Sequence, residues 1–137
     1  PMKRMLAGKR ALNSSRKGDA AIGRQKSIDE NPKAKLNVQK ESMHPVIRTH
    51  PETNRKALYI NKGHTVCFEG TTIEESANIL EYLFKHQTRP EFTCRFKWSK
   101  GSIAVWDNRC AQHYPLNDYH GQRRVMHRVT MTGDQPK

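Results

Sequence analysis

Residues 92–98 alternate strictly between apolar and polar side chains, and this alternation is the strongest fold signal in the sequence. The apolar positions are Phe92, Cys94, Phe96 and Trp98. Successive side chains of a β-strand point to opposite faces, so a period of two predicts a strand with one buried face. Residues 99–101 predict a turn into a second strand at 103–106, and residues 123–131 predict the last strand.

Short β-rich runs also occur earlier in the chain. Residues 46–49 and 57–60 are separated by the turn-forming residues 51–54, which predicts a hairpin. Residues 65–68 predict a further strand. Many short strands with turn signals between them are typical of an antiparallel barrel or sandwich. The predicted fold class is therefore mainly β with helical insertions (α+β).

One helix interrupts the strands. Thr72 and Glu75 have the spacing of a capping box, in which each side chain bonds the other residue's backbone amide. Apolar residues then recur at helical spacing, at Ile73, Ala77, Leu80 and Phe84, with Ile79 and Leu83 widening the stripe. The helix is predicted to end near His86, before Pro90.

The N-terminal part of the chain is strongly basic. Residues 1–40 contain eleven Lys or Arg against three acids, a local net charge of +8 out of a total of +12. Residues 2–12 predict a short basic amphipathic helix, and residues 13–41 predict a long loop or disordered segment. Such charge raises nucleic acid as a partner, but no nucleic-acid motif supports it, so this interpretation ranks last.

Cysteine usage and hydropathy indicate a cytoplasmic protein. Three cysteines without a C-x-x-C pair argue against a disulfide framework. No apolar run approaches the roughly 20 residues of a membrane span, and no signal peptide is visible.

The residues most suited to chemistry lie between Trp106 and Arg128. His113 follows a predicted strand, and Arg124 and Arg128 share one face of the last strand. Four residues along a strand separate two guanidinium groups by about 13 Å, which suits two anions or two ends of one extended site. Taken singly, each residue also has a plainer interpretation: a structural histidine, two solvated arginines and a core tryptophan.

Three segments resemble the taurine dioxygenase (TauD/TfdA) family: HPVIRTHPETNRKALYIN at 44–61, KHQTRPEFTCRFKWSKGSIAVWDNR at 85–109 and WDNRCAQHYPLNDYHGQRRVMHR at 106–128. The resemblance implies that residues 44–137 are the C-terminal portion of a double-stranded β-helix (jelly-roll) dioxygenase. Residues 1–43 would be a basic helix followed by a variable excursion.

By this resemblance the chain is part of an Fe(II)- and 2-oxoglutarate-dependent dioxygenase. His113 is then an iron ligand, Arg124 pairs with 2-oxoglutarate, Arg128 meets the acidic group of the substrate, and Trp106 lies close to the iron pocket. The implied reaction uses O₂ to hydroxylate a small anionic organic molecule, of the sulfonate, sulfate ester or aryloxyacetate type.

The sequence departs from the family at the other two iron ligands, which come from an H-x-D/E motif. The only such match, His50-Pro51-Glu52, resembles a loop remote from the metal, so we do not assign it to iron. We therefore expect no dioxygenase activity from this chain alone. We also expect homo-oligomers, because half a jelly-roll leaves strand edges unpaired. The alternative is a non-catalytic, degenerate or truncated family member that acts as a binding module.

Overall fold

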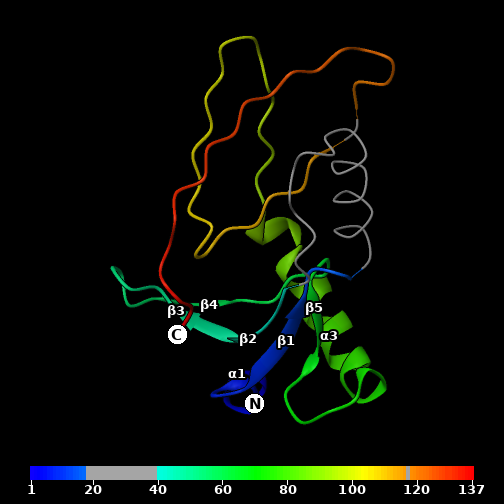
Figure 1. The fold of residues 1–137 in the computed structure, drawn as a ribbon, viewed down its shortest axis with the longest axis vertical. Coiled ribbons are helices and arrows are strands. Elements are labelled where there is room, and N and C mark those ends of the chain that lie inside the picture. The colour runs from blue at the N-terminus through cyan, green and yellow to red at the C-terminus, as the bar shows by residue number, and fades with distance from the viewer. Residues whose placement is uncertain (18–39, 117) are drawn as a thin grey trace.

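The computed structural model describes residues 1–17, 40–116 and 118–137. These residues form short strands and a few helices (Figure 1). The strands are β1 (Arg10–Ser14), β2 (Glu41–Pro45), β3 (Ile47–Thr49), β4 (Lys56–Leu58) and β5 (Thr65–Phe68). The helices are α1 (Met2–Leu6), α3 (Ile73–Gln87) and the 3-10 turn η1 (Pro90–Phe92). None of these helices is long and apolar enough to cross a membrane.

The strands of the described residues make two small antiparallel sheets. In the first, β1 lies between β2 and β5, with Leu12 opposite both Met43 and Cys67. In the second, β3 pairs with β4 and places Arg48 opposite Ala57. The predicted hairpin and the predicted strand at 65–68 are confirmed. The predicted combination of strands with helical insertions is confirmed as well.

The helix predicted for residues 2–12 is only half right. Helix α1 ends at Leu6, and Gly8 takes a left-handed φ of 74°, which glycine adopts without steric cost. Residues 10–14 form strand β1 instead, where Ala11 is buried and hydrogen-bonded neighbours lie on both sides. Pairing with two strands outweighs the helical preference of Ala and Leu. Of the excursion predicted for 13–41, residues 18–39 lie outside the described part of the chain.

Helix α3 begins at the predicted capping box. The Glu75 amide donates to the Thr72 hydroxyl (3.2 Å), and the Thr72 amide donates to the Glu75 carboxylate (2.7 Å). Of the predicted apolar stripe, Leu80 and Leu83 are buried, whereas Ile73 and Ala77 are exposed. The first turn instead directs Ser76 inward, because its hydroxyl accepts a hydrogen bond (2.9 Å) from the Phe68 amide of β5.

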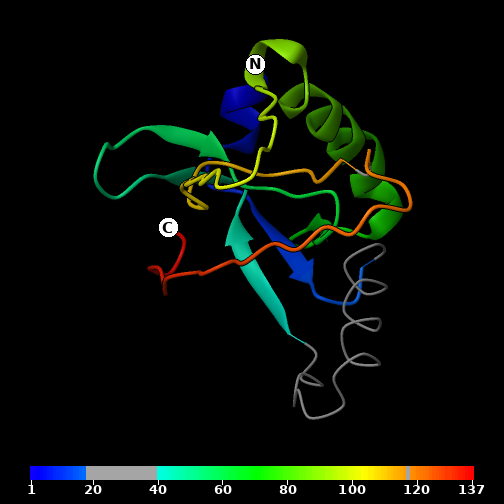
Figure 2. The ribbon, with the colours of Figure 1, turned by 90° about the horizontal axis from the view of Figure 1, so that it is seen from above.

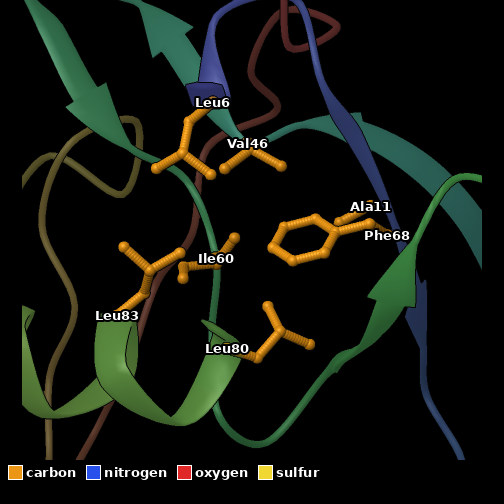
Figure 3. Close-up of a cluster of buried hydrophobic side chains, with 7 residues drawn as sticks. All are labelled: Leu6, Ala11, Val46, Ile60, Phe68, Leu80 and Leu83. Carbon is orange, nitrogen blue, oxygen red and sulfur yellow. The ribbon is translucent and has the colours of Figure 1, made fainter. Parts of the chain in front are cut away.

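The N-terminal segment, both sheets and α3 come together (Figure 2), and the apolar core lies between them (Figure 3). Its fully buried members are Leu6, Ala11, Val46, Ile60, Phe68, Leu80 and Leu83. Leu80 and Leu83 project from α3 toward Ile60 and Phe68, as Figure 3 shows. This core holds the segment after β4 in place, and that segment borders the candidate site.

The strands predicted at 92–98, 103–106 and 123–131 are wrong for this structure. Within the described residues these segments belong to no sheet, although the turn is present, with the Ser102 amide donating to the Ser99 carbonyl (3.0 Å). In Figure 1 residues 92–98 and 103–106 lie away from the two sheets, and the chain after residue 123 runs back toward β3. A strand needs backbone hydrogen bonds to a neighbouring strand, and no such bonds join these three segments to another described segment. Large apolar side chains there are exposed, among them Phe92, Phe96, Ile103, Val105, Val125 and Val129.

Candidate functional site

His113 and Trp106 lie side by side, with ring centroids 5.1 Å apart. The Trp106 indole nitrogen donates to the Asn108 side chain (2.8 Å), which fixes the orientation of the ring. His113 is exposed, and its imidazole has no hydrogen bond or ion pair to any residue that the structure describes. Both ring nitrogens of His113 are therefore free to bind a ligand.

Arg124 and Arg128 are both exposed. The Arg124 guanidinium lies over the Tyr119 ring, 5.1 Å from its centroid. Across the ranges 1–17, 40–116 and 118–137, no hydrogen bond or ion pair joins either arginine to His113. The strand that would present both guanidinium groups on one face is not formed, so the predicted site residues are only partly brought together.

A polar network that the sequence did not reveal holds the loop before His113. Asp107 accepts a hydrogen bond from His50 (3.0 Å), and Arg109 contacts both Asp107 (2.7 Å) and Glu52 (2.8 Å). His50 is buried, and its Nδ1 accepts from the backbone amides of Glu52 and Thr53. Because Nδ1 accepts, the ring proton lies on Nε2, and His50 donates to Asp107.

These contacts stabilise the ionised form of Asp107. Hydrogen bonds first from Arg109 and then from His50 hold the pKa of the Asp107 carboxyl well below its usual range. Hydrogen bonds to the carboxylate of Asp107 and, to a lesser extent, that of Glu52 raise the pKa of the Arg109 guanidinium. The network therefore keeps its charges at any physiological pH and ties residues 107–109 to the β3–β4 turn.

Proximity alone makes His50, Asp107 and Cys110 a possible metal cluster, since their ligand atoms lie within 4.8 Å of one another. The hydrogen bonds argue against it. A metal on His50 Nε2 would move the ring proton to Nδ1, where it would face two backbone N–H donors. Asp107 is also neutralised by Arg109. These residues hold the loop in place and do not fit a metal ion. The segment His50-Pro51-Glu52 therefore offers no iron pair.

A second set of contacts fixes the residue directly before His113. The Gln112 side-chain amide donates to the Ile60 carbonyl (2.6 Å) and accepts from the Asn61 side-chain amide (3.1 Å). Asn61, Gln112 and Cys110 also line a cavity of about 360 Å³ together with polar residues of β1 and β2 and the loop after β4. His44 and His64 also line this cavity.

The C-terminal residues return to strand β3. Asp134 pairs with the guanidinium of Arg48 (2.8 Å), a side chain that is 3% exposed and lies over the Tyr59 ring. The Thr49 amide donates to the backbone carbonyl of Lys137 (3.0 Å). The Arg48 hydrogen bond lowers the pKa of Asp134. These contacts tether the end of the segment that carries Arg124 and Arg128.

The described residues form no complete three-ligand metal site around His113. A 2-His-1-carboxylate site needs three ligands and open positions beside them. His113 offers a free imidazole, whereas no Asp, Glu, Cys or second His of the described segments groups with it as a metal cluster. A single imidazole cannot form such a site alone.

Comparison with known proteins identifies related enzymes. The chain is 41% identical over 97 residues to the alpha-ketoglutarate-dependent sulfate ester dioxygenase of Pseudomonas putida, covering 70% of this chain and 32% of that protein. It is 37% identical over 108 residues to an alkylsulfatase of Acinetobacter baylyi, covering 78% and 33%. A crystal structure of a putative alpha-ketoglutarate-dependent taurine dioxygenase from Burkholderia xenovorans superposes with a TM-score of 0.61 at 35% identity, covering 80% and 33%.

The chain thus spans about one third of the length of the relatives that it matches. The model of the family described as "Taurine catabolism dioxygenase TauD, TfdA family" matches residues 3–130, which is nearly the whole chain. That match includes β1, both sheets, α3 and the segment from Trp106 to Arg128. The chain therefore belongs to the taurine catabolism dioxygenase TauD, TfdA family.

Proposed function

We propose that these residues are the C-terminal portion of an Fe(II)- and 2-oxoglutarate-dependent dioxygenase that hydroxylates a small anionic organic substrate. Among the predicted substrate types, a sulfate ester comes first, because two of the relatives are a sulfate ester dioxygenase and an alkylsulfatase. The observation that carries the proposal is the imidazole of His113. It is unpartnered among the described residues, it packs on Trp106, and it follows a loop held by two polar networks.

Each site residue has a distinct role in this proposal. His113 binds iron, and Arg124 pairs bidentately with the distal carboxylate of 2-oxoglutarate, a task suited to a planar guanidinium. Arg128 binds the acidic group of the organic substrate, and Trp106 lines the metal pocket. The iron, when bound with 2-oxoglutarate and O₂, supplies the oxidising chemistry.

The proposal also requires further polypeptide. One imidazole cannot hold iron against water, since a preformed site needs its other ligands. The exposed apolar residues between 92 and 131, in segments without a neighbouring strand, are suited to pairing with the strands that complete a jelly-roll. We infer that residues equivalent to the remainder of the relatives supply both the missing ligands and those strands. The 137-residue chain alone is then inactive.

The test is succinate formation from 2-oxoglutarate by the native protein, assayed with an alkyl sulfate, an alkyl sulfonate and an aryloxyacetate. Arg124→Gln should raise the KM for 2-oxoglutarate, and Arg128→Gln should raise the KM for the organic anion. Arg123→Gln is the matched control, since Arg123 is an exposed neighbour with no proposed role. Absence of succinate with all three anions, in protein that has retained iron, would overturn the proposal.

A second candidate is a non-catalytic binding module. The observation that favours it is that the described residues form no three-ligand metal group around His113, while many large apolar side chains are exposed. Such a module would be purified without iron and would form no succinate, and His113→Ala would leave its partner binding unchanged. The dioxygenase proposal expects bound iron and succinate formation, and it expects His113→Ala to lose both.

A further inference from the structure

Gln112 stands directly before the proposed iron ligand, and its side chain bridges two residues of the segment after β4. Its Nε2 donates to the Ile60 carbonyl (2.6 Å), while its Oε1 accepts from the Asn61 Nδ2 (3.1 Å). A longer contact of 3.5 Å reaches the Gln87 side chain at the end of α3. Gln112 therefore connects the His113 loop to the core-facing segment and to the main helix.

The neighbouring hydrogen bonds fix which side-chain atoms of Asn61 and Gln112 donate and which accept. The Asn61 Oδ1 accepts from the Gly63 backbone amide (2.7 Å), so the Asn61 Nδ2 must point toward Gln112. The Gln112 Oε1 then faces that donor, and the Gln112 Nε2 faces the Ile60 carbonyl. A flip of either amide would place two donors or two acceptors against each other.

The two residues that Gln112 contacts, Ile60 and Asn61, are themselves held in place by the fold. Ile60 is 1% exposed and belongs to the apolar core, so its carbonyl cannot shift without disturbing that core. The Asn61 backbone amide donates to the Thr65 hydroxyl (2.9 Å), and that hydroxyl donates to Asn13 of β1 (2.7 Å). The position of Gln112 is therefore set by buried parts of the fold.

His113 has no comparable support of its own. Among the described residues no hydrogen bond or ion pair holds its imidazole, and its one ring contact is with Trp106, so its placement depends largely on the backbone around it. At the other end of the loop, the hydrogen bond between His50 and Asp107 provides a second anchor. Metal ligands must be held to within about 0.5 Å of their productive position, and outer-shell partners usually do this.

We propose that Gln112 is a positioning residue for His113, and that the amide bridge among Ile60, Asn61 and Gln112 sets the place of the iron ligand. This inference rests on the proposed function, because it takes His113 as a ligand. The bridge acts through the main chain and not through the His113 ring. It should therefore change the affinity for iron without changing which residues bind it.

The experiment measures the Fe(II) dissociation constant of the native protein by anaerobic equilibrium dialysis, together with its thermal midpoint. Gln112→Leu removes both hydrogen bonds at similar volume, and Gln112→Glu keeps the acceptor for Asn61 but loses the donor to Ile60. Each variant should bind Fe(II) about 10-fold more weakly, the lower end of the loss seen when a group that bonds a metal ligand directly is removed, because Gln112 acts on His113 only through the main chain.

Two controls separate positioning from general destabilisation. Gln87→Leu removes only the long contact, and Thr72→Ala weakens α3 without touching the loop; both should leave the Fe(II) dissociation constant within about threefold of the parent value. If Gln112→Leu also stays within threefold while His113→Ala loses iron, the bridge is only structural and the inference is wrong. If His113→Ala itself retains iron, the proposed function fails and the inference fails with it.

Discussion

Replacing Leu83 by alanine tests how the core supports the site. Leu83 projects from α3, is 2% exposed, and belongs to the cluster that includes Leu6 and Ile60. The substitution removes three buried carbons, which corresponds to about 2.4 kcal/mol of lost transfer free energy at about 0.8 kcal/mol each. The cavity left beside Ile60 adds to this, so we expect the free energy of unfolding to fall by about 3 kcal/mol.

The assay is urea denaturation of the 137-residue chain, followed by far-UV circular dichroism of the helical signal. Tyr82→Ala is the matched control, because Tyr82 is the preceding residue of the same helix, is 55% exposed and stacks on the exposed side of the helix with His86. The control should cost less than about 1 kcal/mol. Equal losses for Leu83→Ala and Tyr82→Ala would refute the assignment of Leu83 to the core.

Two further predictions concern capping and charge. Thr72→Ala removes the acceptor for the Glu75 amide and should lower the free energy of unfolding by about 1 kcal/mol, measured by urea denaturation; Thr72→Ser should restore most of it. Asp107 has a folded-state pKa below its unfolded value because Arg109 and His50 bond its carboxylate, so its contribution to stability is present at neutral pH and is lost as the pH falls below about 4. Asp107→Asn should therefore flatten the dependence of the thermal midpoint on pH in the acid range, and an unchanged acid slope would contradict this account.

Features that depend on neighbouring residues in the chain were predictable from sequence. The capping box at Thr72 and the helical spacing of Leu80 and Leu83 are local, and the structure confirms them. The hairpin of β3 and β4 is also local, since a short turn connects its strands. The strands predicted between residues 92 and 131 failed because a strand forms only beside a partner, which a period of two cannot supply.

In the candidate site, too, contacts between residues close in sequence differ from contacts between distant ones. Trp106 and His113 are seven positions apart, and the structure brings their rings into contact. The bond between His50 and Asp107 spans 57 positions, and the bond between Gln112 and Ile60 spans 52. No local pattern indicates such pairs. Polar residues placed just before a proposed ligand were the one available signal, and Gln112 is such a residue.

The assignment of Arg124 and Arg128 remains a prediction. Both follow from the family resemblance, and the described structure neither joins them to His113 nor gives them other ion-pair partners. Their places depend on the strand at 123–131, which needs a neighbouring strand to form. The KM measurements on their variants therefore test the two assignments independently of the fold.

The most direct test of the central claim is the intact mass of the native protein, with iron content and succinate formation measured on the same sample. The account expects a mass well above 15.9 kDa, about one iron per chain and succinate formed from 2-oxoglutarate with a sulfate ester. A native mass of 15.9 kDa with neither iron nor succinate would contradict it, and His113, Arg124 and Arg128 would then have no catalytic role in this protein.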